Sequence, residues 1–429
     1  MKILHLNYTD TGGGAAIAAL NLVEAQNKNG TDATLGVIKH QTASPFVLTV
    51  LKKRAFYNKV IDTIKFFFKY IKDGLSISNF LFFKTTNGIQ HSKNNKTLAD
   101  IKWINNSDFD IVHLHWINAD MLSIKDIAKI KKPIVWTMHD SWPFCGAEHH
   151  PNVLENDNRY QTGYYRINKP KSTHGIDLCR KVWNKKRRYL QKKDIVFISP
   201  STWERDCLEQ SKLFSDKRCF IIPNIIQKNI FKPLDKVAVR NFLQIPNDKK
   251  IIGFGAAYDV DNPRGIKGSY YLLQLLQKLP VPNDYFLVIF GSASADFTSK
   301  IRVPYFASGF VHNPIILAQL YNACDCFINP SLIESFGLTT CESICCGVPV
   351  AAFDFGGTKD IIEHKANGYL AKPYDVDDLL EGIEYCIENY ETLSINCLEK
   401  AKKDFDNDKI IRQHLEVYES ILSKKDLMK

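Results

Sequence analysis

Short apolar runs alternate along the chain with longer segments of helical periodicity, and Gly, Pro or Asn bounds most of these runs. Apolar runs without internal alternation are typical of parallel strands that are buried on both faces. In the first half, the pattern predicts strands at residues 3–7, 111–115, 134–138 and 195–199. A second set starts afresh at residues 251–255, 286–290, 326–329 and 348–353. Strands that alternate with helices predict the α/β class, with parallel sheets built from βαβ units.

The two sets of strands predict two doubly wound domains, which suits a chain of 429 residues. We expect an N-terminal domain at residues 1–222 and a C-terminal domain at residues 249–403. The segment 223–248 contains three Pro residues and has mixed polarity, so it is the expected linker. Residues 404–429 are expected to form a charged amphipathic helix that packs back toward the N-terminal domain. Two such domains facing each other would hold a ligand between them, beyond the carboxyl ends of the strands.

The excess of basic residues, which leaves a formal net charge of +10, is local. Residues 52–84 combine Lys with Phe, Tyr and Ile, and a basic amphipathic helix of this kind can lie on an anionic membrane surface. In the alternative, the aromatic side chains pack on the N-terminal domain and the Lys side chains are only solvated. A second basic run at residues 185–188 favours the surface interpretation. The sequence has no helix-turn-helix, zinc-finger or RNP-like motif, so no nucleic-acid partner is expected.

The chain carries neither a signal-peptide core nor an apolar stretch near the ~18 residues that a bilayer crossing needs. Its eleven cysteines are an odd number, and most lie among apolar neighbours. Reduced, buried thiols are typical of cytosolic proteins. We therefore expect a cytoplasmic protein, whose basic surface is a candidate for peripheral contact with the anionic inner face of the cell membrane.

Two carboxylates, Glu334 and Glu342, stand eight residues apart on either side of Gly337. They follow a predicted strand, and a helix is expected to begin in the turn between them. Gly337 allows the backbone to approach a ligand closely, and the free amides at a helix start attract a phosphate. Each carboxylate suits a vicinal diol, so the pair can contact successive parts of one long ligand. The alternative is that Glu334 helps to cap the helix and Glu342 is solvated.

The sequence around these carboxylates favours the ligand-binding interpretation. The segment 329–342 (NPSLIESFGLTTCE), followed in order by residues 346–350, 355–362 and 367–370, resembles the E-x7-E region of the retaining glycosyltransferases of family 4. That family has the GT-B fold, in which two Rossmann-like domains face a central cleft. The resemblance extends over nearly the whole chain and is most specific from about residue 305 to residue 375.

The resemblance assigns roles within this stretch. It implies that Glu334 contacts the hydroxyls of the donor sugar and that Glu342 contacts the ribose. The amides near Gly337 and Leu338 would hold the diphosphate, and Phe336 belongs to the same donor-binding stretch.

A cation for the diphosphate is expected after the first strand of the C-terminal domain. In the family, a Lys that precedes a Gly neutralises the pyrophosphate, and the resemblance places Lys267 in this role; such a cation also stabilises the departing nucleoside diphosphate. The family's Arg at the strand end is missing, because Gly255 is followed by Ala256 and Ala257. Arg264 is the candidate that would replace it. The alternative is that Arg264 and Lys267 are ordinary surface cations.

Two loops of the N-terminal domain are expected to border the cleft. The first strand leads into a Gly triplet that includes Gly13 and Gly14, and the backbone amides of such a loop can meet a substrate. The strand at residues 134–138 ends in His139 and Asp140, where an α/β sheet presents functional side chains. A structural, hydrogen-bonding role for this His is the alternative. The segment H-D-S-W-P-F resembles one bacterial polysaccharide-making branch of the family, and this resemblance puts His139 beside the transferred sugar.

The sequence favours no cofactor. His113 and His115 alternate onto one strand face, but their spacing to later His and Cys residues matches no zinc pattern. The D-x-D segments at 259–261 and 375–377 stand in loop contexts, whereas metal-dependent transferases of the other major fold need this motif at a strand end. The Gly triplet lacks the G-x-G-x-x-G spacing and the Walker Lys, so neither a nicotinamide nor ATP is indicated. We expect no obligatory metal or other cofactor.

These features predict a retaining glycosyltransferase that moves a hexosyl group from a nucleotide-diphosphate sugar, UDP- or GDP-linked, to a lipid-linked or oligosaccharide acceptor. The resemblance points to cell-surface polysaccharide synthesis, as in lipopolysaccharide, O-antigen, capsule or exopolysaccharide assembly. The expected catalytic residues are His139, Glu334 and Lys267. Because of the missing strand-end Arg, a catalytically degenerate sugar-nucleotide-binding or scaffold protein of the same fold is the alternative. A GT-B epimerase and a transferase with a soluble acceptor also remain open.

Overall fold

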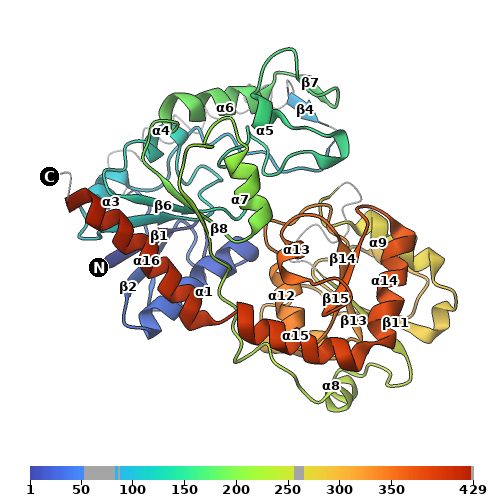
Figure 1. The fold of residues 1–429 in the computed structure, drawn as a ribbon. Helices are drawn as coiled ribbons and strands as arrows, with labels where there is room; N and C mark the ends of the chain where they lie inside the picture. Colours follow the sequence, from blue (N-terminus) through green and yellow to red (C-terminus); the bar gives the residue numbers. More distant parts are fainter. Residues whose placement is uncertain (53–82, 86, 256–264, 427–429) are drawn as a thin grey trace, which may run out of the picture.

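Two parallel β-sheets, one from each half of the chain, organise the protein into two domains that lie side by side (Figure 1). The predicted α/β class is confirmed. The computed structural model describes residues 1–52, 83–85, 87–255 and 265–426. Most of the basic, aromatic segment 52–84 and Arg264 therefore lie outside the described residues.

The first sheet has seven parallel strands in the order β3-β2-β1-β5-β6-β8-β9. Its strands are β1 (Lys2–Leu6), β2 (Asp32–Val37), β3 (Val47–Thr49), β5 (Ile111–Leu114), β6 (Ile134–Thr137), β8 (Val196–Ser199) and β9 (Cys219–Ile221). The order reverses between β1 and β5, where His5 lies opposite His113. A doubly wound sheet of this kind presents its functional loops at the carboxyl edge beside this switch point.

Helices cover both faces of the first sheet, because successive side chains of a strand point to opposite faces. Leu4 and Val112 belong to the larger apolar cluster, which also takes side chains from α3, α4, α6 and α7. Ile3 and Ile111 point the other way, into a cluster with α1 and α16. The helices of this half are α1 (Gly14–Lys28), α3 (Ile101–Asn106), α4 (Ile124–Ile127), α5 (Arg159–Thr162), α6 (Leu178–Tyr189), α7 (Thr202–Glu209) and the short η1 (Val153–Glu155). A small antiparallel pair, β4 (Phe83–Thr85) and β7 (Thr173–Gly175), stands apart from the sheet.

The second sheet has six parallel strands in the order β12-β11-β10-β13-β14-β15. Its strands are β10 (Lys250–Gly255), β11 (Tyr285–Phe290), β12 (Tyr305–Ala307), β13 (Cys326–Asn329), β14 (Val350–Phe353) and β15 (Gly368–Ala371). Helices α9 and α14 cover one face, and α8, α11, α12 and α15 cover the other. The helices of this half are α8 (Lys236–Leu243), α9 (Ser269–Lys278), η2 (Pro282–Asp284), α10 (Ala295–Thr298), α11 (Pro314–Asn322), α12 (Leu338–Cys345), α13 (Thr358–Ile361), α14 (Val376–Glu388) and α15 (Tyr390–Asp404).

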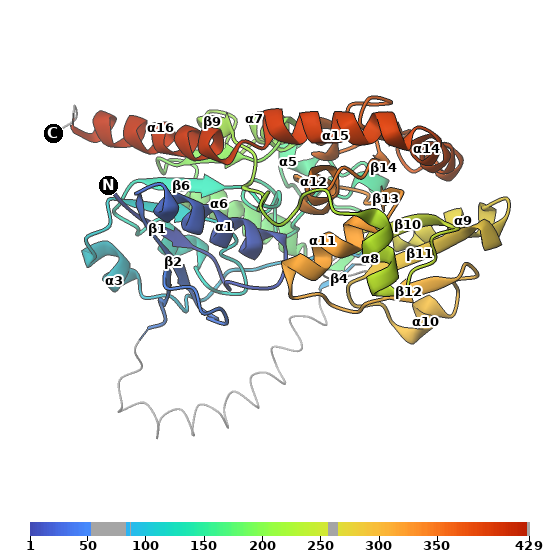
Figure 2. The same ribbon diagram turned by 90° about the horizontal axis from the view of Figure 1, so that it is seen from below.

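Two segments connect the domains. The segment 223–248 contains α8, and Val239 and Ile245 pack in the apolar core of the second domain. At the other end of the chain, α16 (Asn407–Asp426) follows α15 after a short break, and its apolar side chains pack on the first sheet. Figure 2 shows α15 lying along the second domain and α16 lying along the first.

Two observations bear on the environment of the chain. All eleven cysteines lie in the described part, none is in a disulfide, and ten are buried. Among the described residues, no helix combines the length and the apolar composition that a membrane crossing requires.

Candidate active site

A cavity of about 500 Å³ lies between the two domains, at the carboxyl ends of both sheets. The loop after β1 and the segment after β6 line it from the first domain, and the loops after β10 and β13 line it from the second. Nine of the eleven residues singled out in the sequence line this cavity: Gly13, Gly14, His139, Lys267, Glu334, Phe336, Gly337, Leu338 and Glu342. Arg264 lies outside the described residues, and Asp140 lies outside the cavity lining.

Lys267 and Glu334 form an ion pair at the second-domain wall of the cavity. Lys267 Nζ donates to Glu334 Oε1 at 2.6 Å, and Ser331 Oγ donates to the same oxygen at 2.9 Å. Both side chains are partly exposed to the cavity, with 29% and 15% of their surface accessible. The ammonium group of Lys267 and the carboxylate of Glu334 are therefore paired with each other within one site.

Gly268 brings the Lys267 loop into contact with the loop after β13. Its φ of +74° lies in the left-handed region, and a Cβ atom there would approach the Pro330 carbonyl oxygen to 1.8 Å. A backbone oxygen cannot move away as a flexible side chain can, so only Gly fits this position. The Lys-Gly pair of the sequence motif thus places the cation beside the helix start that follows Glu334.

Helix α12 begins at Leu338 and points its N-terminus at the cavity. Gly337 precedes it with a φ of +103°, and no side chain among the described residues caps the first turn. The first amides of a helix lack intrahelical partners, and together with the helix dipole they attract an anion. The start of α12 is thus available to a phosphate group.

Glu342 lies in the same helix, one turn after its start, and also lines the cavity. Its carboxylate is buried and accepts a hydrogen bond of 2.9 Å from the hydroxyl of Tyr321. Burial raises the pKa of Glu342 to about 7. A buried carboxylate with one protein donor retains acceptor capacity for hydroxyl groups of a ligand. The structure therefore contradicts the alternative in which Glu342 is solvated.

His139 and Asp140 follow β6 and take different positions. His139 lines the cavity, whereas Asp140 is buried and accepts hydrogen bonds from His149 Nδ1 at 2.6 Å and from Trp116 Nε1 at 2.9 Å. Burial acts to raise the pKa of Asp140, but the nearby His149 and the hydrogen bonds outweigh it, so the pKa lies below the usual value. Asp140 thus fixes the loop that carries His139 and His149.

The Gly loop after β1 faces the second domain across the cleft. Gly14 opens α1, and a Cβ atom on it would come within 3.3 Å of Leu338 Cδ1. Nearby, Ser201 Oγ donates to the Ser335 carbonyl oxygen at 2.6 Å. These contacts bring the first domain directly against the start of α12.

His150 is a cavity residue for which we predicted no ligand role. It lines the cavity, only 9% of its surface is exposed, and its Nδ1 has no hydrogen-bond partner among the described residues. Burial lowers its pKa to about 4, so the ring is neutral at neutral pH. The dipeptide His149-His150 gave no signal of its own, because neither residue follows a strand directly.

Two groups of described side chains bring three potential metal ligands within 4.8 Å of one another: His5, His113 and His115, and His91, Glu148 and Cys179. In the first group, all six ring nitrogens already take part in hydrogen bonds. The histidines that alternate along β5 thus belong to a hydrogen-bonded network.

The basic run at residues 185–188 is not wholly a surface feature, which corrects our interpretation. Lys186 is fully buried and donates to the carbonyl oxygens of Trp142, Cys145 and Gly146. Burial lowers its pKa to about 7. Lys186 therefore satisfies backbone acceptors in the loop that follows His139.

Comparison with known proteins identifies both halves of the chain. Residues 12–229 match the family described as Glycosyltransferase Family 4, and residues 238–404 match Glycosyl transferases group 1. Among curated proteins, the chain is similar to an uncharacterized glycosyltransferase of Methanocaldococcus jannaschii (26% identity, covering 43% of this chain and 48% of that protein). It is also similar to the lipopolysaccharide core biosynthesis mannosyltransferase LpsB of Rhizobium meliloti (26% identity, covering 47% and 60%). The matches thus span about half the length of these relatives.

The fold is similar to that of a solved structure, Anabaena Alr3699/HepE in complex with UDP and glucose. The TM-score is 0.64 at 18% identity, and the match covers 98% of this chain and 100% of that one. This likeness confirms the predicted GT-B architecture of two Rossmann-like domains around a cleft. Because its family match covers half of the chain, and because the second half matches a glycosyltransferase family as well, the chain belongs to glycosyltransferase family 4.

Proposed function

We propose that this protein is a retaining glycosyltransferase that moves a hexosyl group from a nucleoside-diphosphate sugar to a glycan or lipid-linked acceptor. One observation carries the proposal: an uncapped helix start, a lysine and two carboxylates line a single cavity between the domains. An anion site flanked by acceptors for hydroxyl groups matches a ligand with a diphosphate between two polyols. Ala256 and Ala257 follow the strand where the family has an Arg, so a catalytically degenerate binding protein is the alternative.

The donor would lie along the loop that runs from Glu334 to Glu342. The amides at the start of α12 and the ammonium of Lys267 would bind the diphosphate. Glu342 would accept hydrogen bonds from the ribose, and Glu334 would accept them from the transferred sugar. In the free protein Lys267 and Glu334 satisfy each other, so the donor would replace one ion pair by two sets of charge-assisted hydrogen bonds.

For the base, the solved neighbour in complex with UDP and glucose supports a UDP-linked donor rather than a GDP-linked one. No metal is assigned a role, because Lys267 and the helix start already supply positive charge to the diphosphate.

Retention requires that the acceptor hydroxyl attack from the face that the diphosphate leaves. In the proposed front-face route, the bond between the anomeric carbon and the phosphate oxygen breaks while the bond to the acceptor oxygen forms. The acceptor proton passes to the departing phosphate oxygen. Lys267 and the amides near Gly337 and Leu338 stabilise the negative charge that develops there. His139 would lie beside the transferred sugar.

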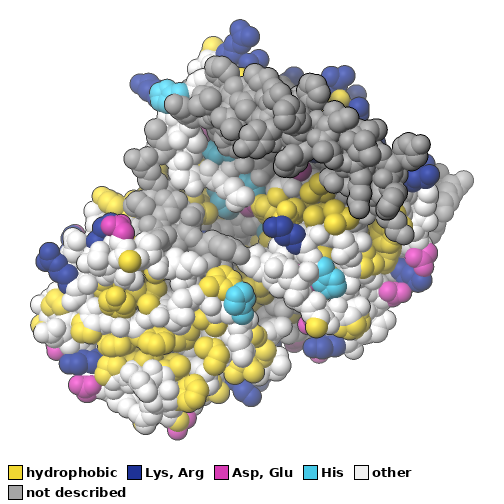
Figure 3. Space-filling view, turned by 180° about the vertical axis from the view of Figure 1, so that it is seen from behind, with side chains coloured by type: hydrophobic (Ala, Val, Ile, Leu, Met, Phe, Trp, Pro, Cys, Tyr) yellow, Lys and Arg dark blue, Asp and Glu magenta, His cyan; other side chains and the backbone are white. Residues whose placement is uncertain are grey.

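The acceptor is proposed to be part of cell-surface polysaccharide assembly, as in lipopolysaccharide, O-antigen, capsule or exopolysaccharide synthesis. The similarity to a lipopolysaccharide core mannosyltransferase supports this class. Such acceptors are presented at a membrane, and Lys and Arg side chains stand along the upper rim of the face seen in Figure 3.

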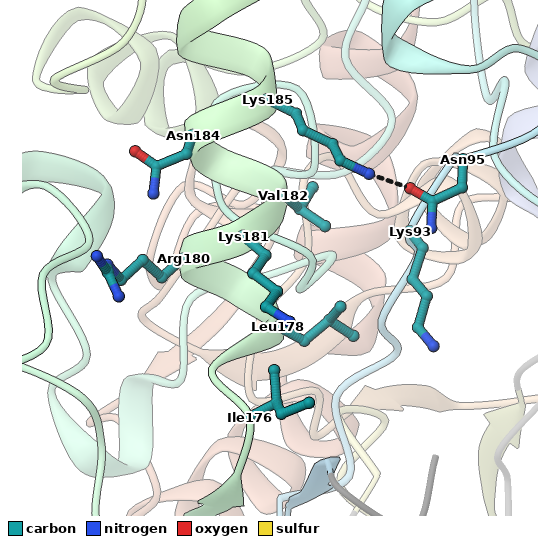
Figure 4. Close-up of a pocket in the computed structure, with 9 residues that line it drawn as sticks. All are labelled: Lys93, Asn95, Ile176, Leu178, Arg180, Lys181, Val182, Asn184 and Lys185. Carbon is teal, nitrogen blue, oxygen red and sulfur yellow. Dashed lines mark hydrogen bonds between the residues drawn. The ribbon is translucent and has the colours of Figure 1, made fainter. Parts of the chain in front are cut away.

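A groove of about 490 Å³ along α6 supports contact with an anionic membrane. Its floor is apolar, and four cations surround it: Lys93, Arg180, Lys181 and Lys185. Figure 4 shows Lys93, Lys181 and Lys185 on one side of α6 and Arg180 on the other. Burial and the charge of Lys181 lower the pKa of Lys185, so an anionic lipid headgroup would relieve repulsion within the groove.

Flotation with vesicles of anionic and neutral lipids tests this contact. The double variant Lys181→Glu, Lys185→Glu should lose at least about tenfold in affinity for anionic vesicles, since each cation near the surface contributes ~1 kcal/mol. The exposed Lys192→Glu, outside the groove, is the matched control. Equal binding by both variants would refute the membrane contact but leave the transferase proposal intact.

The transferase proposal is tested with UDP-, GDP-, ADP- and dTDP-sugars. Thermal stabilisation by one donor, weakened in Glu342→Ala, is expected. With an acceptor screen, transfer should follow, and NMR of the product should show the anomeric configuration of the donor. An inverted product would exclude the front-face route, and donor binding without transfer or hydrolysis would favour the degenerate binding protein.

A further inference from the structure

A row of hydrogen-bonded side chains runs from the cavity into the core of the first domain. His139 Nε2 lies 2.9 Å from His115 Nδ1, and His115 Nε2 lies 2.9 Å from His5 Nδ1. The row ends at α1, where His5 Nε2 lies 2.8 Å from Gln26 Oε1. His5, His115 and Gln26 are buried, and only His139 reaches the cavity.

The sheet topology brings these residues together. Strands β1, β5 and β6 are adjacent, and His5, His115 and His139 stand on or just after their carboxyl ends on the face that α1 covers. Their rings stack at centroid distances of 5.2 Å. Burial lowers the pKa of His5 to about 3 and of His139 to about 4, and it lowers the pKa of His115 well below its usual value. Each ring is therefore neutral, with one N–H and one lone pair.

Gln26 sets the direction of the row. Its Nε2 donates to the hydroxyl oxygen of Tyr418 at 3.2 Å, which leaves Oε1 as the partner of His5. An amide oxygen only accepts, so His5 must carry its proton on Nε2 and accept on Nδ1. His115 then donates from Nε2 and accepts on Nδ1, and His139 donates from Nε2.

The Tyr418 hydroxyl is compatible with this direction. It accepts from Gln26 and donates to His113 Nδ1 at 2.7 Å, and His113 Nε2 donates to Thr137 Oγ1 at 2.7 Å. Each of these three hydrogen bonds then pairs one donor with one acceptor. If the Gln26 amide were reversed, every hydrogen bond of the row would reverse with it.

We propose that Gln26, His5 and His115 are positioning residues that hold His139 as the Nε2–H tautomer, so that its Nδ1 accepts a hydrogen bond from a hydroxyl of the bound sugar. This inference rests on the proposed function only in taking the ligand to be a sugar. A lone pair in the cavity recognises the hydrogen of a hydroxyl group, whereas an N–H would recognise its oxygen.

The tautomer can be measured without any substrate. Long-range ¹⁵N–¹H NMR of protein labelled at His nitrogens distinguishes a protonated from an unprotonated ring nitrogen. In the wild type, His139 Nδ1 should be unprotonated. Gln26→Glu keeps an acceptor toward His5 and should preserve this tautomer, whereas Gln26→Leu should give a mixture. Protonated Nδ1 in the wild type, or an unchanged tautomer in Gln26→Leu, would overturn the proposal.

Binding measurements test the consequence for the sugar. Gln26→Leu should weaken the nucleotide sugar about three- to tenfold and leave the nucleoside diphosphate alone unaffected, with rescue by Gln26→Glu. At the hydroxyl that His139 contacts, the deoxy and deoxyfluoro donors should lose affinity equally, because fluorine cannot donate. A fluoro donor that binds like the parent sugar would refute the acceptor role.

His414→Gln is the matched control. His414 is a buried imidazole on α16 that bonds the Ile410 carbonyl and stands outside the row. The His414→Gln substitution should not change the tautomer of His139. It should also leave unchanged the ratio of the affinities for the nucleotide sugar and for the nucleoside diphosphate. If the wild type binds no nucleotide at all, the proposed function fails, while the NMR measurement still decides the tautomer.

Discussion

Replacing Glu342 by Gln should separate the stability of the second domain from its affinity for nucleotide. The variant keeps an oxygen that accepts from the Tyr321 hydroxyl, removes the charge, and replaces the second oxygen by an amide NH2 group. Burial raises the pKa of Glu342 from 4.5 to about 7. Between these two pH values the folded state holds a proton that the unfolded state has released. The free energy of unfolding therefore falls as pH rises from about 4.5, and the loss levels off above about 7.

The shift corresponds to about 3 kcal/mol at pH 8.5 and to about 1 kcal/mol at pH 5. Glu342→Gln should therefore raise the thermal midpoint of the second domain by roughly 2–4 °C per kcal/mol, most at alkaline pH. Scanning calorimetry at both pH values measures this gain. The control is Glu384→Gln, whose carboxylate also accepts from a Tyr hydroxyl but is partly exposed. A gain that is absent, or equal at both pH values, would refute the assignment of the cost to a buried charge.

The same variant should bind nucleotide about 10- to 100-fold more weakly, because hydrogen bonds to a charged group contribute about 1.5–3 kcal/mol. In the proposed binding mode, donor binding to the wild type should also release protons, since the ribose hydroxyls would stabilise the ionised carboxylate of Glu342. More protons should leave per bound nucleotide sugar at pH 6 than at pH 8.5, where the carboxylate of the free protein is already ionised. Calorimetric titration in buffers of different ionisation enthalpy measures this release, and Glu342→Gln should abolish it.

Three further substitutions give distinct outcomes. Lys267→Ala should lower kcat about 100-fold or more with a smaller change in KM, measured in steady-state assays; unchanged turnover would remove its role at the leaving group. Gly268→Ala should destabilise the second domain by at least about 1–3 kcal/mol in thermal scans, because of its positive φ and the Pro330 carbonyl. Lys186 has a pKa lowered to about 7, so wild-type stability should rise between pH 7 and about 10 as the unfolded state alone stays protonated, and Lys186→Met should lose this slope.

The sequence pattern located the central strands because most of their side chains are apolar. The run at 111–115 corresponds to β5 and that at 251–255 to β10, and each is flanked by strands on both sides. The strands β3, β9 and β12 have three residues each, which is too short for a periodicity to emerge. In β2, Gly36 stands between apolar residues, and a Gly at this position is also typical of the start of a loop. A place at the edge of the sheet, rather than composition, decides β3, β9 and β12, whereas β2 is an internal strand between β1 and β3.

The candidate site could likewise be predicted only in part: residues of one local motif were found, and residues far apart in the sequence were not. The positions of Glu334 and Glu342 follow from one continuous motif, so a local pattern was sufficient. His5 and His115 stand 110 residues apart, and nothing in either neighbourhood indicates that the other lies 2.9 Å away. Lys186 could have been recognised, because it follows Cys179 and Val182 at helical spacing on the buried face of α6. Its neighbours in the basic run concealed that periodicity.

Helix α16 completes the core of the first domain, although it follows every element of the second domain in the sequence. Ile3 and Ile421 share one apolar cluster, and both termini lie at the first domain (Figure 1). Without α16, the face of the first sheet that this helix covers is open to solvent. The clusters of the second domain need no residue beyond 405, so this domain does not depend on α16. A released chain truncated after residue 406 should therefore yield a protease-resistant second domain and a sensitive first domain.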